Sequence, residues 1–198
     1  MTRSPEGTRG RLLRVAREIL ESEGLAAVTL RAVGAAAGVS RGAPYRHFTD
    51  KSDLLAAVAA EALEMLTAAV DAAARDTIDP VERIDHALRA YVDMALRVPE
   101  LYSLIFGTDL RIAQSVDLRE AGLGAYAALR ALVGDVSRSD LEPDLVTSML
   151  WATMHGSVML VLAGHTEPDQ RLDDPLNLVR HAARALLGIP LPATNRRR

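Results

Sequence analysis

Hydrophobic residues recur at helical spacing through most of the chain. The first periodic stretch covers residues 8–23 and is followed by Gly24, a residue type that favours a helix end. Later stretches predict helices over residues 51–75, 79–98, 100–106, 117–136, 145–164 and 174–188. No alternating stretch is long enough to indicate a strand, so the pattern predicts an all-α protein of about nine helices.

Aspartates mark the beginnings of several of these helices. Asp50, Asp79 and Asp174 each stand immediately before a predicted helix, and the last two are followed by proline. An aspartate side chain accepts hydrogen bonds from the first free N–H groups of a helix, and proline suits the first helical position. Gly188 is predicted to end the last helix.

Residues 29–48 differ because they predict two short helices around a glycine turn. Thr29 can cap the first helix with its hydroxyl, while Leu30 and Val33 share its buried face. Gly38 supplies a left-handed turn residue, a conformation that a Cβ atom disfavours. The pattern is that of a helix-turn-helix motif, although a plain packing corner between two helices has the same appearance.

The second helix of the motif is predicted to begin with Ser40 as its cap. In a helix-turn-helix this helix enters the DNA major groove with its first residues leading, here Arg41, Gly42 and Ala43. Pro44 has no N–H to donate within the helix, and it disfavours helical backbone angles at Ala43. The sequence therefore predicts a recognition helix that begins irregularly.

Residues 145–164 contain no acidic residue, lysine or arginine over twenty positions. That length is sufficient to span a bilayer. Its Thr, Ser, His and Gly residues, the acidic residues around it and the lack of flanking basic clusters argue against insertion. We interpret it as a helix buried on several sides, within the bundle and against a partner subunit.

Charge is unevenly distributed. The whole chain has a formal net charge of −3, but residues 1–53 contain nine basic and six acidic side chains, a net +3 that leaves −6 for the remainder. A basic N-terminal module on an acidic body is typical of a protein of which one end meets phosphates.

Composition excludes several other classes. There is no cysteine, so disulfides, thiol nucleophiles and thiolate metal sites are excluded. The histidines are scattered, and no catalytic constellation or metal-binding pattern is present. Gly122, Gly124 and Ala127 match a phosphate-loop spacing but lie within a helical pattern. The charged N-terminus lacks the apolar core of a signal peptide, so we expect a cytoplasmic protein without cofactor or metal.

The N-terminal region resembles the TetR/AcrR family of bacterial transcriptional repressors. The resemblance runs from Arg11 to Leu55. It rests on ESEG before Leu25, TLR at residues 29–31, AAAGVS at residues 35–40, YRHF at residues 45–48 and DKSDLL at residues 50–55. It implies a three-helix DNA-binding domain, residues 1–50, that is followed by a helical effector-binding and dimerisation domain.

The resemblance also implies roles for single residues. Tyr45, His47 and Lys51 would contact phosphates, residues 41–44 would face base edges, and Phe48 would lie in the core. The complete implied DNA-binding set is Thr29, Arg31, Ser40, Arg41, Gly42, Ala43, Pro44, Tyr45, His47 and Lys51. Three arginines on the first helix, Arg11, Arg14 and Arg17, either reach the DNA backbone or form a solvated face.

In the C-terminal half, Trp151, His155 and Gly156 resemble the WHG-type C-terminal domain of part of this family. The family pairs its last two long helices with their copies across a two-fold axis. The implied interface is Met149, Ala152, Gly156, Met159, Ala163, Val179, Ala183 and Leu186. The implied effector pocket is Tyr91, Met94, Tyr102, Phe106, Tyr126, Trp151, Met154 and His155, although any one of these side chains is equally explained as core.

Together these observations predict a ligand-responsive repressor. It would bind a near-palindromic, double-stranded DNA operator as a homodimer and be released by a small apolar effector. Residues 51–190 would form the second domain, with helix 51–75 as a linker, and residues 191–198 would form a disordered tail. The alternative is a small-molecule-binding helical module that no longer reads DNA. An all-α enzyme lacks support because no catalytic constellation is present.

Overall fold

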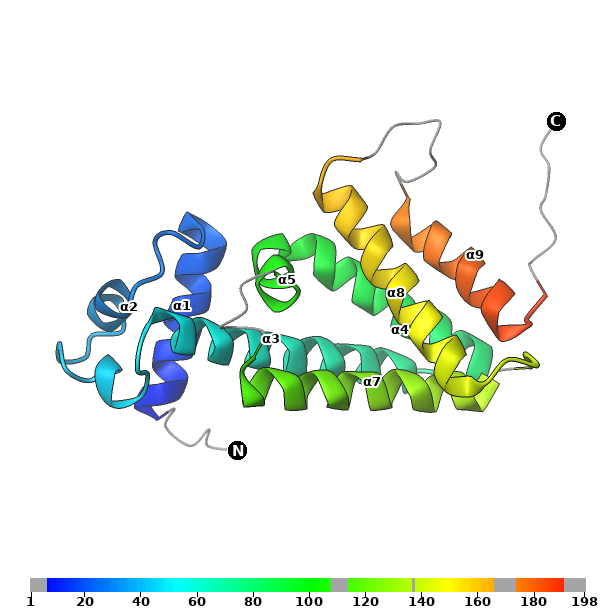
Figure 1. Ribbon diagram of the computed structural model, residues 1–198, viewed down its shortest axis with the longest axis horizontal. Helices are drawn as coiled ribbons and strands as arrows, with labels where there is room; N and C mark the ends of the chain where they lie inside the picture. The colour runs from blue at the N-terminus through cyan, green and yellow to red at the C-terminus, as the bar shows by residue number, and fades with distance from the viewer. Residues whose placement is uncertain (1–6, 108–113, 137, 166–173, 191–198) are drawn as a thin grey trace. The chain divides into compact units, whose positions relative to one another are not determined.

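The computed structural model describes residues 7–107, 114–136, 138–165 and 174–190 of the chain. These residues form eight α-helices and one short 3-10 helix, with no strand among them, as the hydrophobic pattern predicts (Figure 1). The elements are α1 (Thr8–Glu23), α2 (Leu30–Ala36), η1 (Pro44–Arg46), α3 (Lys51–Ala74), α4 (Pro80–Arg97), α5 (Pro99–Ile105), α7 (Val116–Val136), α8 (Pro143–Leu162) and α9 (Pro175–Leu187). The predicted tail at residues 191–198 lies outside the described residues.

The predicted helix ends are confirmed where the sequence marks them. Asp79 Oδ1 accepts from the backbone N–H groups of Val81 and Glu82 at 2.8 and 3.0 Å, which caps α4. Asp174 Oδ1 accepts from the backbone N–H of Asn177 at 2.9 Å and caps α9. These side chains satisfy N–H groups that have no partner inside their own helix.

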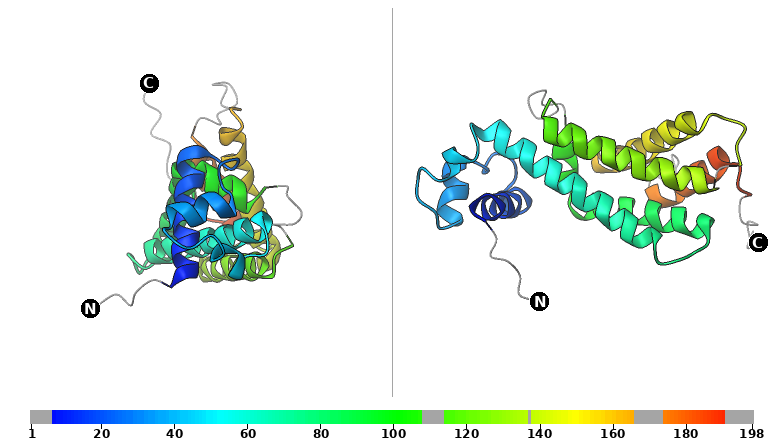
Figure 2. Two further views of the ribbon diagram at one scale, coloured as in Figure 1. Left: turned by 90° about the vertical axis from the view of Figure 1, so that its left-hand side faces the viewer. Right: turned by 90° about the horizontal axis from the view of Figure 1, so that it is seen from below.

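The chain divides into two compact units. The first comprises Met1–Met65 and Val98–Leu123, and the second Leu66–Arg97 and Gly124–Arg198. Two of the three divisions fall inside α3 and α7, each of which is one uninterrupted helix (Figure 2), and the third falls between α4 and α5. Residues 98–123 are thus grouped with the N-terminal region. The domain boundary that the sequence predicts at residue 50 stays a prediction.

In the first unit, α1 packs against both α2 and α5. The apolar stripe predicted for α1 is the buried one, because Leu12, Ala16 and Leu20 are at most 2 % exposed. Val28, Val33, Phe48 and Leu54 complete this core. Burying this apolar surface stabilises the unit that positions the helix-turn-helix segment.

In the second unit, α8 packs against α9 and α4, and α4 also packs against α9 (Figure 1). The core side chains of α8 are Val146, Leu150 and Val158. α9 is held to α4 by a two-point ion pair, in which Arg180 Nε lies 2.6 Å from Asp85 Oδ1 and Nη2 lies 2.5 Å from Oδ2.

α8 is long and apolar enough to cross a membrane, with a mean hydropathy of 1.5 over its most apolar window. Length and composition alone do not distinguish such a helix from the core helix of a bundle. The buried hydroxyls of Thr147 and Ser157 donate to the backbone carbonyls of Pro143 and Thr153, four residues earlier in the same helix. Because both hydroxyls form hydrogen bonds within their own helix, these two polar side chains can be buried on an apolar packing face.

Candidate nucleic-acid interface

The first half of the helix-turn-helix segment forms as predicted. Thr29 Oγ1 accepts from the backbone N–H of Ala32 at 3.1 Å and caps α2. Leu30 and Val33 are 7 % and 0 % exposed. Gly38 has φ +66°, the left-handed conformation that the turn requires.

The second half departs from the prediction, because only the 3-10 helix η1 stands where a recognition helix was expected. Pro44 cannot donate to the carbonyl of Ser40, four residues earlier. The N–H of Ala43 donates to that carbonyl instead, at 2.9 Å, which tightens the turn. The predicted side-chain cap by Ser40 is therefore wrong, and Ser40 contributes its carbonyl. The backbone angles of Ala43 are also helical, φ −63° and ψ −44°, contrary to expectation.

Two residues expected to face base edges point inward. Ala43 is 3 % exposed, and Pro44 is also buried. Pro44 packs closely on α2, since a Cβ atom added to Gly34 would stand 2.7 Å from Pro44 Cγ. Ala43 and Pro44 are thus buried in this conformation, and their base-facing role stays a prediction. Pro44 forms a packing contact between η1 and α2.

The exposed side of the segment carries arginines that have no partner of their own. Arg31, Arg41 and Arg46 are exposed, and their side chains make no hydrogen bond and no ion pair within the described part of the chain. Tyr45 is also exposed, at 60 %. Sequence reasoning omitted Arg46, although its place inside the YRHF motif was an available signal. Unpaired cations on one face form the electrostatic footprint of phosphate binding.

A groove of about 390 Å³ lies between α2 and η1. Leu30, Gly34, Ala35, Val39 and Pro44 line it with apolar surface. Arg31, Arg41 and Tyr45 are its exposed polar lining. An apolar groove beside unpaired cations suits an anionic polymer that also has apolar edges.

The remaining residues of the predicted DNA-binding set occupy different settings. His47, Gly42 and Ser40 are exposed. Lys51 is half-buried, and its Nζ donates to the carbonyl of Leu25 at 2.8 Å, so this lysine also joins the start of α3 to the chain segment before α2. Phe48 is 2 % exposed and lies in the core, as expected.

Of the three α1 arginines considered for a backbone contact, Arg11, Arg14 and Arg17, the last two are engaged by acidic residues. Arg14 Nη1 donates to Glu18 Oε1 at 2.8 Å, and Arg17 Nη1 lies 3.7 Å from Glu61 Oε2. Their charges are partly neutralised, which favours the interpretation of α1 as a structural and solvated face over a DNA contact.

The residues predicted to line an effector pocket are divided between the two units. Tyr102 and Phe106 belong to the first unit, where their ring centroids lie 4.8 Å apart. The other six belong to the second unit. Among them, Tyr91 and Met154 are buried, at 8 % and 6 % exposure. The pocket as a whole stays a prediction.

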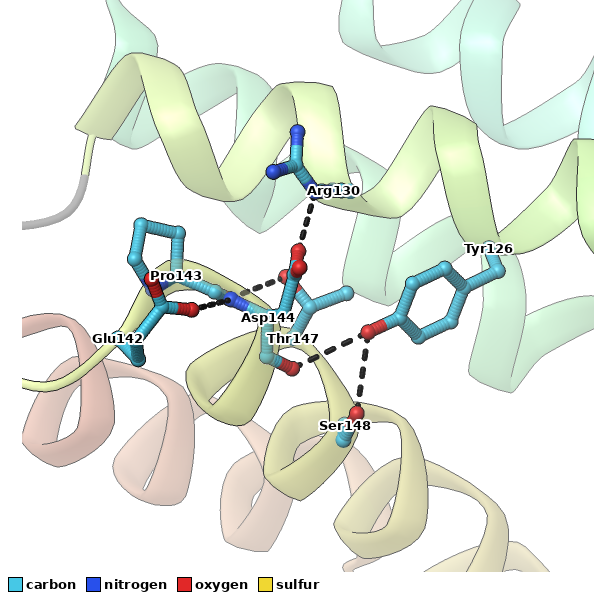
Figure 3. Close-up of polar contacts among 7 residues, drawn as sticks. All are labelled: Tyr126, Arg130, Glu142, Pro143, Asp144, Thr147 and Ser148. Atoms are coloured by element: carbon cyan, nitrogen blue, oxygen red, sulfur yellow. Dashed lines mark hydrogen bonds and ion pairs between the residues drawn. The ribbon is translucent and has the colours of Figure 1, made fainter.

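One group of polar contacts joins α7 to the start of α8 (Figure 3). Arg130 forms an ion pair with Asp144, which raises the pKa of the guanidinium, mainly through the hydrogen bond to that carboxylate. The Tyr126 hydroxyl donates to the carbonyl of Asp144 at 3.1 Å and lies 3.0 Å from Ser148 Oγ. The Tyr126 ring also stacks at 5.7 Å on Trp151. Two predicted pocket aromatics are therefore held together by this contact.

His155 follows on α8, where it is half-buried. Burial lowers the pKa of His155, because an apolar surrounding disfavours the protonated ring. The described residues contain no group of three or more His, Asp or Glu side chains placed to hold a metal ion.

The predicted dimer residues fall on two different faces. On α8, Met149, Ala152 and Ala163 are exposed, while Gly156 and Met159 are half-buried. On α9, Leu186 is half-buried, but Val179 and Ala183 are only 0 % and 2 % exposed. Val179 and Ala183 repeat every four residues on the stripe of α9 that packs into the core of its own unit. The dimer interface as a whole stays a prediction.

Comparison with known proteins agrees with this geometry. Residues 12–58 match the family model of bacterial regulatory proteins of the tetR family, and residues 84–186 match the tetracyclin repressor-like C-terminal domain. The HTH-type transcriptional activator FasR of Mycolicibacterium smegmatis is 30 % identical over 149 residues, which cover 66 % of this chain and 68 % of that protein. The WHG-type assignment of the C-terminal half stays a prediction.

Solved structures share the fold across the chain. A protein of unknown function from Rhodococcus sp. RHA1 superposes with a TM-score of 0.76 and 26 % identity, covering 93 % of this chain and 96 % of that one. FadR from Bacillus subtilis, in complex with stearoyl-CoA, superposes with a TM-score of 0.68, 15 % identity and coverage of 91 % and 98 %. At that identity the likeness shows the fold alone. The matches to both halves establish that this chain belongs to the tetR family of bacterial transcriptional regulators.

Proposed function

We propose that this chain is a ligand-responsive repressor that binds a near-palindromic operator as a homodimer in the cytoplasm. The observation that carries the proposal is the set of exposed, unpaired arginines, Arg31, Arg41 and Arg46, on a family-matched helix-turn-helix unit. Such cations release counterions when they meet phosphates, and this release supplies much of the affinity for DNA. A two-fold symmetric protein requires a two-fold symmetric site.

The dimer is proposed to form through the outward face of α8. Leu145, Met149 and Leu160 are 50 %, 40 % and 40 % exposed, and Ala152 lies between them on the same side. Successive separations of four, three and eight residues place them along one stripe of the helix. A continuous apolar stripe with a small residue in it suits packing against the same stripe of a second copy.

The effector is proposed to be a small, largely apolar molecule that binds in the second unit near Tyr126, Trp151 and His155. These side chains offer apolar surface with few polar groups, as ligand sites commonly do. The apolar part to test first is a long acyl chain, supplied as a free fatty acid and as its CoA ester, because a protein of this fold from Bacillus subtilis binds stearoyl-CoA. Coupling between effector and operator of about 1–3 kcal/mol, roughly 5–150-fold in affinity, is typical of such switches.

The reduction of the recognition helix to η1 favours a second candidate. A module with this short turn would bind small molecules without reading sequence. The two candidates differ in how their DNA binding depends on sequence and salt. Non-specific binding is lost steeply as salt rises, whereas base contacts keep a preference for the operator.

Fluorescence anisotropy tests the proposal. The protein is titrated onto the duplex from just upstream of its own gene and onto a scrambled duplex of equal length, at two salt concentrations. A preference for the native duplex that survives the higher salt supports a sequence-specific regulator. Equal, salt-erased binding to both leads to selection from random duplexes. Failure to enrich any sequence would exclude a sequence-specific regulator and favour the second candidate.

A reporter assay then decides the direction of regulation. Repression predicts that the protein lowers transcription from an operator-bearing promoter and that the effector restores it. An increase in transcription would instead make the chain an activator, which is what the name of its Mycolicibacterium smegmatis relative says of that protein.

A further inference from the structure

The groove between α2 and η1 has an unusual character for the surface of a DNA-reading segment. It measures about 390 Å³, and most of its lining is apolar. Pro44, which packs onto Gly34, lines it together with Ala35 and Val39. Covering exposed apolar surface of this kind with another apolar group is favourable, because it removes that surface from water.

The chemistry of DNA restricts what that group can be. In the major groove the base edges present hydrogen-bond donors and acceptors, and the C5-methyl group of thymine is the apolar exception. The flanking cations add a second restriction. Arg41 is suited to the O6 and N7 acceptors of guanine, while Arg31, near the N-terminus of α2, is suited to a backbone phosphate.

We propose that this groove receives the C5-methyl group of one thymine in each operator half-site, against Ala35, Val39 and Pro44. The deoxyribose of the same nucleotide fills further volume, and Arg41 reads a guanine beside the thymine. The inference rests on the proposed DNA-binding function and adds to it the base that the apolar groove selects.

The experiment begins with an operator obtained by selection from random duplexes. Each thymine of one half-site is then replaced by deoxyuridine, which removes the methyl group and keeps every hydrogen bond of the base pair. One position per half-site is expected to lose about fourfold in affinity, the value of one buried methyl group. Cytosine at that position lowers affinity, and 5-methylcytosine there recovers about the same factor.

Two variants of α2 locate the effect. Ala35 and Ala36 are neighbouring exposed alanines, and only Ala35 lines the groove. Ala35→Leu fills the groove, so the ratio of thymine to deoxyuridine affinity is expected to fall to one. Ala36→Leu adds the same side chain outside the groove and is expected to keep the ratio near four.

Each outcome decides the matter. A selected operator whose binding ignores every thymine methyl overturns the inference and leaves the proposed function standing. Methyl sensitivity that persists unchanged in Ala35→Leu also overturns it, because the methyl then lies elsewhere. If no sequence is enriched at all, the proposed function fails and the inference falls with it.

Discussion

At the scale of single residues, Pro44 determines the conformation of the DNA-reading segment. Its missing N–H shifts the hydrogen bond of the Ser40 carbonyl to Ala43, and its ring is buried against Gly34. The exposed side chains of this segment consequently include those of Arg41, Tyr45 and Arg46.

Arg41→Ala is expected to weaken operator binding by about 1–3 kcal/mol and to relax sequence preference at one position, because an arginine that reads guanine contributes discrimination as well as affinity. Tyr45→Phe removes one hydroxyl from an exposed ring and serves as a comparison. It is expected to weaken binding to operator and scrambled DNA similarly. Anisotropy titrations of both variants on both duplexes check this, and equal losses on the two duplexes for Arg41→Ala would refute base reading.

His155 predicts a pH dependence of stability. Burial holds its pKa in the folded protein below the unfolded value of about 6.5, so the unfolded chain takes up its proton first as the pH falls. The contribution of His155 to stability is therefore complete above about pH 6.5. It is lost as the pH falls from that value toward the lowered folded pKa.

Urea unfolding at several pH values between about 5 and 8 measures this effect. His155→Gln replaces the ring with a group that does not titrate, so its unfolding free energy is expected to change less across this range than that of the wild type. Parallel pH profiles for the two proteins would contradict the assignment.

At the scale of elements, the contact between α2 and η1 predicts an unusual glycine effect. Gly34→Ala is expected to destabilise the protein by about 1–3 kcal/mol, because the new Cβ would meet Pro44 Cγ at 2.7 Å. Inside a helix, a change from glycine to alanine ordinarily raises the free energy of unfolding by about 1 kcal/mol. Gly124→Ala, in α7 with open space around the added Cβ, is the control and is expected to stabilise.

Unfolding of the double variant tests the cause. Gly34→Ala with Pro44→Ala removes the ring atom that the new methyl meets, so the two free-energy changes are expected not to add. Additive changes would show that the clash with Pro44 is not the origin of the loss.

At the scale of the whole molecule, the exposed stripe of α8 predicts the oligomeric state. Met149→Glu places a carboxylate on this stripe and, by two-fold symmetry, a second one from the partner near it. Dimer dissociation is expected to increase by at least about tenfold, since burying an unpaired charge is costly. Sedimentation velocity measures this change. Leu123→Glu, at a site on α7 that is 65 % exposed, is the control and should leave the dimer intact.

Much of this protein was predictable from local sequence. The caps at Thr29, Asp79 and Asp174 and the left-handed turn at Gly38 depend on hydrogen bonds and backbone preferences within a few residues, so sequence alone determines them. The family also follows from the sequence, because its motifs are concentrated in residues 11–55.

Tertiary structure decided the features that depend on which face of an element packs inward. The pattern of α9 shows that Val179 and Ala183 share a face, but packing on α4 and α8 assigns that face to the core of the same unit. The inward turn of Pro44 and the groove beside it likewise depend on contacts between separate elements. Periodicity establishes that two residues lie together on a surface, whereas only the packed chain determines what that surface meets.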